Sequence, residues 1–225
     1  FSSYGLAEPT PLDEVNHIDQ ELILNDFMVA EKRLERLNLD QKRGRKSDPE
    51  ERALLEACIS TVENNTPLRR QPELASAPLL RGFAFLSSKP MLVLFNNADE
   101  DDCLPDITGR GSNELCLAIR GKLEHELAQM SPEEAAEFLK EFDIATSAKD
   151  RIIAKSYELL GLISFFTVGE DEVKAWTIRK HTAAIDAAEA IHTDLKKGFI
   201  RAEVLAYDDL MTAGSYAAAR KLGTV

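Results

Sequence analysis

The fold class is decided by Met91-Leu-Val-Leu-Phe-Asn-Asn-Ala-Asp-Glu-Asp-Asp102, where five apolar residues run unbroken and then stop at amides and carboxylates. A run of this length predicts a strand buried on both faces, as in a parallel sheet. In open α/β sheets, ligands bind just beyond the carboxyl ends of such strands. The polar groups of Asn96, Asn97, Asp99 and Glu100 therefore lie where a ligand is expected, and they suit the edge of a nucleobase. A solvated loop is the alternative.

Size and composition limit the classes of function. A chain of 225 residues suits one large domain or two small ones. The net charge of −12 disfavours undirected binding to nucleic acid, DNA included, or to an anionic membrane, but it permits a local basic patch. Cys58, Cys103 and Cys116 are odd in number and far apart, so we expect free thiols in a reducing cytoplasm and no metal site. No apolar run approaches the roughly 18 residues of a membrane span, and no signal peptide is recognisable.

Two amphipathic helices are expected before this strand. Residues 1–12 have the glycine and prolines of a linker. From Asp13 to about Leu39, apolar residues recur mostly every three to five positions, at Ile18, Leu22, Phe27, Val29, Leu34 and Leu37. A second helix, to about Asn64, is predicted to bury Leu54, Leu55, Cys58, Ile59 and Val62. It begins with Asp48 as N-cap and Pro49 at the first helical position.

A basic turn, Lys42-Arg-Gly-Arg-Lys46, joins these helices. Residues 13–82 are therefore predicted to form a helical hairpin of the coiled-coil type, with irregular or broken helix after residue 64. The turn is suited to contacting RNA phosphates, and a solvated hairpin tip is the alternative.

The amino-acid composition of the rest of the chain changes near residue 162. Before it, Glu114–Ile119 is a second apolar run that ends in Arg120-Gly-Lys122. Helices follow at Leu123–Met130, at Ser131–Leu139 with a capping box of Ser131 and Glu134, and at Lys149–Leu160. After it, β-branched and aromatic residues predict strands at Ile163–Val168, Val173–Ile178 and Phe199–Val204, with a helix over Ala183–Leu195 between the last two.

Three of these segments closely resemble the carboxyl-terminal part of the YchF/Obg-like ATPase family. They are Arg151-Ile-Ile-Ala-Lys-Ser-Tyr-Glu-Leu-Leu-Gly-Leu-Ile-Ser-Phe-Phe-Thr-Val-Gly169, Val173-Lys-Ala-Trp-Thr-Ile178 and Ile191-His-Thr-Asp-Leu-Lys-Lys-Gly-Phe-Ile-Arg-Ala-Glu-Val204. Glu21-Leu-Ile-Leu-Asn-Asp26 and Glu31-Lys-Arg-Leu-Glu-Arg36 extend the resemblance to the family's coiled-coil insertion.

This resemblance implies an α/β fold. Residues 83–161 correspond to the second half of a P-loop G domain, into which the helical hairpin of residues 13–82 is inserted. Residues 162–225 correspond to a TGS domain of the α+β, β-grasp type, incomplete at its carboxyl end. The resemblance implies that members bind and hydrolyse ATP, often in preference to GTP, with Mg²⁺, and that they associate with ribosomes. We therefore expect a cytoplasmic nucleotide hydrolase; a non-hydrolysing module that contacts ribosomes or RNA is the alternative.

The resemblance also assigns base-reading residues. The family alters the guanine-reading Asn-Lys-x-Asp of G proteins to Asn-x-x-Glu, and Asn97-Ala98-Asp99-Glu100 fits that altered form. Asn96-Asn-Ala-Asp99 fits the older form one residue earlier, so the register is open, although the flanking residues favour Asn97 to Glu100. The family's second base-side loop, Ser-Ala-Lys, falls on Arg120, Gly121 and Lys122.

The sequence departs from the family in several places. Arg120 and Gly121 replace the family's Ser and Ala, and His181, Ile185, Asp186 and Glu189 replace residues that are usually Gly, Pro, Gln and Gly. No Gly-x-x-x-x-Gly-Lys-Ser/Thr occurs in these 225 residues, so the phosphate-binding and magnesium-binding elements of P-loop enzymes are absent from the sequence. We therefore expect an internal fragment of a divergent member, inactive by itself.

Overall fold

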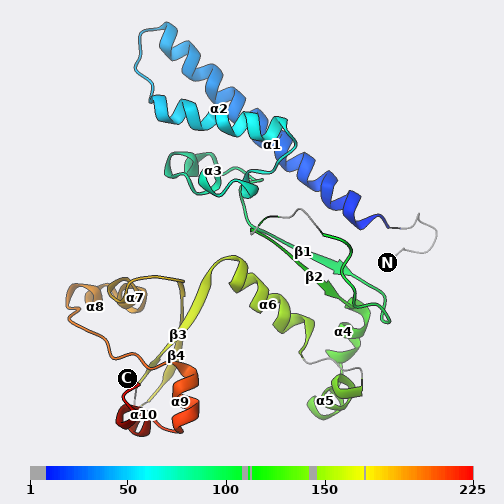
Figure 1. Ribbon diagram of the computed structural model, residues 1–225, viewed down its shortest axis with the longest axis vertical. Coiled ribbons are helices and arrows are strands. Elements are labelled where there is room, and N and C mark those ends of the chain that lie inside the picture. The colour runs from blue at the N-terminus through cyan, green and yellow to red at the C-terminus, as the bar shows by residue number, and fades with distance from the viewer. Residues whose placement is uncertain (1–8, 108–110, 112, 142–145, 170, 225) are drawn as a thin grey trace. The chain divides into compact units, whose positions relative to one another are not determined.

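A computed structural model describes residues 9–107, 111, 113–141, 146–169 and 171–224 of the chain (Figure 1). Residues 1–8 of the predicted linker lie outside this part. The chain divides into two units, residues 1–160 and 161–225. Among the described residues, no helix has the length and apolarity needed to cross a membrane.

The first unit begins with the predicted helical hairpin. Helix α1 spans Pro11–Lys42 and helix α2 spans Pro49–Glu63, and the two run side by side in opposite directions (Figure 1). The Asp48 carboxylate accepts a hydrogen bond from the backbone N–H of Glu50 at 2.9 Å, and Pro49 occupies the first helical position. The predicted start of α2 is therefore confirmed, and the basic turn lies between the helices.

The buried face of α1 includes two aspartates that the apolar periodicity does not indicate. The buried residues of α1 are Val15, Asp19, Ile23, Asp26, Ala30 and Leu37. Of the six apolar residues named from the sequence, Leu37 is buried, Phe27, Val29 and Leu34 are partly buried against the core, and Ile18 is 55% exposed. The aspartates were missed because apolar periodicity assigns charged residues to the solvent face. Here Asp19 and Asp26, seven residues apart, share the inner face and have polar partners there.

A hydrophobic core forms between the hairpin and the chain that follows it. In α2, Leu55, Cys58 and Val62 are buried as predicted, and Leu54 and Ile59 are partly buried against them. Burial, reinforced by the charge of Asp26, raises the pKa of the Cys58 thiol to about 11. The core is completed by residues from three short helices, η1 (Leu68–Arg70), α3 (Pro72–Ser76) and η2 (Pro78–Phe83).

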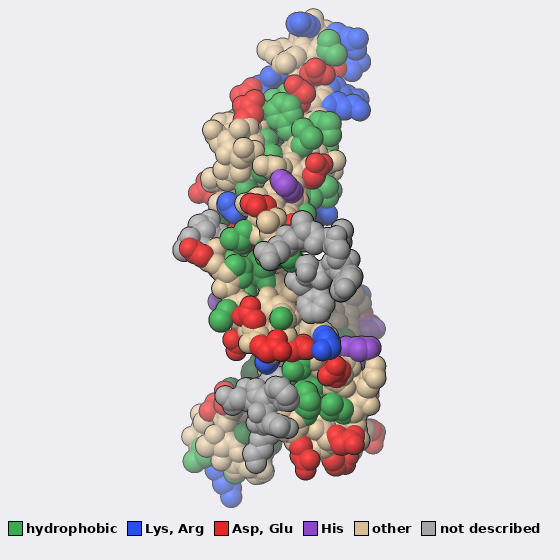
Figure 2. Space-filling view, turned by 90° about the vertical axis from the view of Figure 1, so that its right-hand side faces the viewer, with side chains coloured by type: hydrophobic (Ala, Val, Ile, Leu, Met, Phe, Trp, Pro, Cys, Tyr) green, Lys and Arg blue, Asp and Glu red, His purple; other side chains and the backbone are tan. Residues whose placement is uncertain are grey.

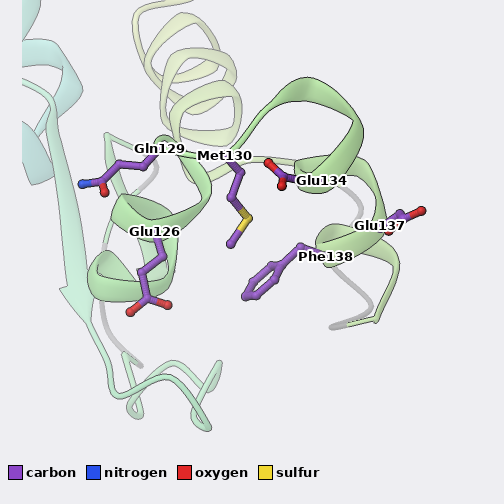
Figure 3. A pocket seen from close by; sticks show the side chains of 6 residues that line it. All are labelled: Glu126, Gln129, Met130, Glu134, Glu137 and Phe138. Atoms are coloured by element: carbon purple, nitrogen blue, oxygen red, sulfur yellow. The ribbon is translucent and has the colours of Figure 1, made fainter.

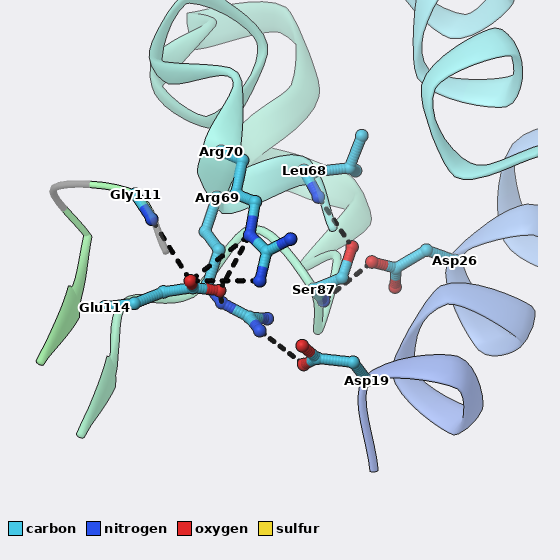
Figure 4. Close-up of polar contacts among 8 residues, drawn as sticks. All are labelled: Asp19, Asp26, Leu68, Arg69, Arg70, Ser87, Gly111 and Glu114. Carbon is cyan, nitrogen blue, oxygen red and sulfur yellow. Dashed lines mark hydrogen bonds and ion pairs between the residues drawn. The ribbon is translucent and has the colours of Figure 1, made fainter. Parts of the chain in front are cut away.

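An ionic cluster fastens α1 to the sheet (Figure 4). The side chain of Arg69 is fully buried; its Nε donates to Glu114 at 2.6 Å and its Nη2 pairs with Asp19. Glu114 also accepts from Arg70 and from the backbone N–H of Gly111, both at 3.2 Å. Burial acts to raise the pKa of Glu114, but the two arginines outweigh it and hold that pKa below its usual value. Glu114 therefore stays ionised at neutral pH.

A second polar contact joins α1 to the chain between η2 and β1. The Asp26 carboxylate accepts hydrogen bonds from the backbone N–H groups of Leu86 and Ser87, both at 2.7 Å. The Ser87 hydroxyl in turn accepts from the N–H of Leu68 at 3.1 Å, and the Ser87 carbonyl accepts from the N–H of Arg69 at 2.8 Å. The buried carboxylate of Asp26 and the buried polar groups of Ser87 are thus paired, as burial requires.

Strands β1 (Met91–Asn96) and β2 (Glu114–Ile119) form the sheet of this unit. They are parallel, with Met91 opposite Glu114 and Asn96 opposite Ile119, so the expected parallel pairing is confirmed. The expected burial of β1 on both faces is wrong: Phe95 is buried, but Leu94 is 39% exposed. Among the described residues the sheet has two strands, so little surrounds β1.

Three helices complete the first unit, namely α4 (Gly121–Leu127), α5 (Pro132–Glu141) and α6 (Ala148–Leu159). Helix α6 packs against both strands. The predicted capping box is present: the Ser131 N–H donates to the Glu134 carboxylate at 3.0 Å, and the Glu134 N–H donates to the Ser131 hydroxyl at 3.3 Å.

The second unit contains an antiparallel pair, β3 (Leu162–Val168) and β4 (Val173–Arg179), at the predicted positions. The predicted helix over 183–195 is instead two helices, α7 (Ala184–Ile191) and α8 (Thr193–Lys197). Extended backbone at His192 separates them, and its imidazole accepts from the N–H of Asp194 at 3.1 Å. Helices α9 (Tyr207–Ala213) and α10 (Tyr216–Leu222), which had not been predicted, end the described chain.

The predicted strand Phe199–Val204 is not formed. Its residues have the composition of a strand, but a strand needs a hydrogen-bonding neighbour. The described strands of this unit pair only with each other, and Ile200 is 91% exposed. Strand propensity was therefore a poor guide where no partner lies alongside.

We predict that Arg69→Ala destabilises the first unit by about 3 kcal/mol or more, because it leaves Asp19 and Glu114 buried beside a missing cation. Urea unfolding followed by circular dichroism measures this loss. Arg45→Ala is the matched control: the Arg45 side chain is 69% exposed and pairs with Asp40 at 3.1 Å. It should cost less than about 1 kcal/mol. Equal losses in both variants would contradict the role assigned to the cluster.

Candidate nucleotide-base site

The candidate site is built by the two loops that leave the carboxyl ends of β1 and β2. The strands end opposite each other at Asn96 and Ile119, and the Asn97 N–H donates to the Ile119 carbonyl at 2.8 Å. Both loops therefore begin at the same edge of the sheet, where open α/β folds bind ligands.

A hydrogen bond between Asn96 and Gly121 joins the loops. The Asn96 Oδ1 accepts from the Gly121 N–H at 2.9 Å. A Cβ atom added to Gly121 would lie 2.7 Å from that oxygen, closer than nonbonded atoms approach. Glycine at position 121 is thus required by this contact and not by an unusual backbone angle, since no positive φ occurs there.

Asp99 is the second link between the loops. Its Oδ2 pairs with the Lys122 ammonium at 3.0 Å, and its backbone carbonyl accepts from Arg120 at 3.4 Å. The Lys122 pKa is raised by this hydrogen bond and by the charges of Asp99 and Glu126. The Asp99 Oδ1 is buried and has no hydrogen-bond partner in the described part of the chain. It is therefore an acceptor without a donor among the described residues.

The other residues predicted for this loop are placed differently. The Asn97 side chain turns back into its own loop and donates to the Cys103 carbonyl at 2.7 Å. Glu100 is exposed, and its side chain makes no hydrogen bond with any described residue. Ala98 is exposed, and its carbonyl accepts from the Asp101 N–H at 3.1 Å. The geometry thus brings Asn96 and Asp99, rather than Asn97 and Glu100, to the second loop.

Of the predicted site residues, Asp99, Arg120, Gly121 and Lys122 are brought together. Asn96 begins the alternative register of the base-reading motif, Asn96 to Asp99. The signal for it in the sequence is its position at the end of an apolar strand. Its contact with Gly121 joins residues 25 positions apart, which no local pattern reveals.

A separate hollow lies between α4 and α5 (Figure 3), lined by Glu126, Gln129, Met130, Glu134, Glu137 and Phe138. Its three carboxylates would repel an anionic ligand, and Glu134 already caps α5. We assign it no part in nucleotide binding. Among the residues that the structure describes, no three His, Cys, Asp or Glu side chains gather as a metal site would require.

The chain is similar to several known proteins in sequence and in fold. Residues 162–225 match the family model described as "YchF-GTPase_C: Protein of unknown function (DUF933)". The ribosome-binding ATPase YchF of Bacillus subtilis is 35% identical over 96% of this chain and 62% of its own length. The YchF GTPase structure of Schizosaccharomyces pombe superposes on all of this chain and 63% of its own, with a TM-score of 0.80 at 29% identity.

The chain belongs to the YchF/Obg-like ATPase family. Obg-like ATPase 1 of Oryza sativa subsp. indica is also similar, at 34% identity over 95% of this chain and 57% of that protein. The chain thus spans about three fifths of the length of the YchF and Obg-like relatives that it matches. The family resemblance noted in the sequence is confirmed, and so is a mixed α/β fold of the YchF kind.

We predict that Gly121→Ala lowers the free energy of unfolding of the first unit by about 1 kcal/mol, because the new Cβ displaces Asn96 and the hydrogen bond between the loops is lost. Gly82→Ala is the control, since nothing lies within 4 Å of a Cβ at Gly82. It should change stability by less than about 0.5 kcal/mol. Thermal and urea unfolding measure both, and an unaffected Gly121→Ala protein would argue against the link.

Proposed function

We propose that this chain supplies the base-binding part of a ribosome-associated nucleoside triphosphate hydrolase. The observation that carries the proposal is the joining of two polar loops, residues 96–100 and 120–122, at the carboxyl edge of a parallel sheet. Relatives named ribosome-binding ATPase and YchF GTPase support the reaction and the partner. A ribosome-bound protein of this kind works in the cytoplasm.

The role that we propose for this chain is recognition of the base, and not chemistry on the phosphates. The two loops hold amide, carboxylate and ammonium groups that suit a heterocycle. Nothing in the sequence has the pattern that cradles phosphates or binds their Mg²⁺. The described residues likewise offer no cluster of metal ligands. We assign the phosphates and Mg²⁺ to the part of the relatives' length that this chain does not match.

The proposal is tested by steady-state hydrolysis of ATP and GTP. We expect turnover by the full-length protein and none above background by residues 1–225 alone. Gly121→Val in the full-length protein should raise KM by about tenfold or more, since it separates the loops that hold the base. Gly82→Ala should leave KM unchanged. Turnover by the 225-residue chain would contradict the assignment of phosphate binding to other parts of the full-length protein. A full-length protein without turnover would favour the non-hydrolysing alternative.

The hairpin tip is the proposed contact with the ribosome. Lys and Arg side chains gather at that end of the first unit (Figure 2), and Lys42, Arg43, Arg45 and Lys46 are all exposed. In a chain of net charge −12, this local cluster is the part suited to RNA phosphates. The ribosome-binding names of the bacterial relatives support this partner.

We predict that the triple change Lys42→Ala, Arg43→Ala and Lys46→Ala weakens ribosome binding about tenfold and makes it less dependent on salt, because phosphate contacts release counterions. Sedimentation with ribosomes at several salt concentrations measures both effects. The control changes Lys180, Arg201 and Lys221, which are exposed in the second unit, to Ala. It removes the same charge, so an equal loss in the control would exclude a specific role for the tip.

A further inference from the structure

The hollow between α4 and α5 is large enough to hold part of another molecule. Its volume is about 610 Å³, within the range of roughly 300 to 1,000 Å³ that is usual for ligand sites. The Met130 thioether and the Phe138 ring point into it (Figure 3), and both side chains are half-buried. The hollow therefore has an apolar centre.

Helix α5 presents its apolar side only partly covered. Ala135, Phe138 and Leu139 recur at helical spacing and are half-buried, whereas Glu133 and Glu137 are exposed. The apolar stripe of such an amphipathic helix normally packs against a neighbouring element. Among the described helices and strands, none makes extensive contact with α5. The open volume thus lies beside a helix whose pattern is that of a packing surface.

Carboxylates surround the apolar centre. Glu126, Glu134 and Glu137 line the hollow, and no lysine or arginine is among the described residues that line it. Glu134 accepts a hydrogen bond from the Ser131 N–H, and that bond holds the Glu134 pKa below its usual value. Glu126 and Glu137 are exposed and form no ion pair within 4 Å with a described residue. All three are expected to be charged at neutral pH.

The cations on the neighbouring elements have other partners. Lys122, one turn before Glu126 on α4, pairs with Asp99 at 3.0 Å. Arg151 of α6 pairs with Glu124 at 3.9 Å. Residues 124–141 contain six glutamates and one lysine in the sequence. The hollow therefore carries negative charge that calls for a cationic partner.

This combination of charge and apolar surface narrows the class of partner. The carboxylates would repel nucleic acid and nucleotides. No cluster of metal ligands occurs among the described residues. An arginine side chain suits both parts of the hollow, because its methylene stem can lie on apolar surface while its guanidinium pairs with a carboxylate. The flexible Met130 can adapt to such a stem, as methionines do in peptide-binding grooves.

We propose that the hollow between α4 and α5 is a docking site for a basic, partly apolar peptide segment of a partner protein. The site uses none of the residues of the two base-site loops, so the inference goes beyond the proposed function and does not depend on it. Exposed ion pairs contribute little individually and are screened by salt. Binding is therefore expected to be weak, salt-dependent and reliant on the apolar centre.

The test uses a fluorescent peptide of about ten residues in which arginine and leucine alternate, titrated with the full-length protein and followed by anisotropy. The double change Glu126→Gln and Glu137→Gln should weaken binding about fivefold or more. Met130→Ala should weaken it about threefold, because the apolar contact is lost. A peptide in which serine replaces leucine should lose affinity by a similar factor.

The matched control is Glu35→Gln with Glu63→Gln, which removes the same charge from exposed positions of the hairpin. It should leave the affinity within about twofold of the original. The position of binding is read from ¹³C-labelled methionine methyl groups. The signal of Met130, assigned by its loss in Met130→Ala, should shift on addition of peptide, and that of Met211 in the second unit should not.

Four results would overturn the inference. The first is no binding of the arginine–leucine peptide, and the second is an equal loss of affinity in the control. The third is equal affinity for the arginine–serine peptide, which would mean that the apolar centre takes no part. The fourth is binding without a shift of the Met130 signal. Unchanged circular dichroism spectra of the variants, whose altered residues are exposed or half-buried, establish that they remain folded.

Discussion

The first unit depends on one buried guanidinium, that of Arg69. It is fully buried, and it joins a carboxylate of α1 to a carboxylate at the start of β2. Removing two carboxylates from water is costly, so Asp19 and Glu114 can occupy the interior only while the cation is present. The direction of α1 relative to the strands follows from this requirement. An apolar contact would tolerate sliding, whereas planar and directional hydrogen bonds to Arg69 do not.

The contact between Arg69 and Glu114 also positions the candidate base site. Glu114 is the first residue of β2 and lies opposite Met91, the first residue of β1. Its bonds to Arg69 and Arg70 therefore position the start of the strand pair whose far end carries the two loops. At that far end, the Asn96–Gly121 bond and the Asp99–Lys122 ion pair hold the loops together. The helical hairpin and the candidate base site are thus linked through a single pair of strands.

Much of the architecture was predictable because it rests on local chemistry. Asp48 and Pro49 mark the start of α2, Ser131 and Glu134 cap α5, and an apolar run marks β1. Three errors share another cause. The buried aspartates of α1, the break at His192 and the unpaired segment 199–204 all depend on what lies across space from a residue. Periodicity and propensity describe a residue's neighbours in the chain and carry no information about distant partners.

The sequence alone determined the family, the helical hairpin, the paired strands and the two loops at their ends, because each depends on patterns within a few dozen residues. It left two registers for the base-reading motif, since Asn96–Asp99 and Asn97–Glu100 fit equally spaced patterns. Only the tertiary structure showed which of these side chains contact the second loop. The Gly121 amide and the Lys122 ammonium reach Asn96 and Asp99 from the neighbouring strand, and a one-residue shift in an extended chain turns a side chain to the opposite face.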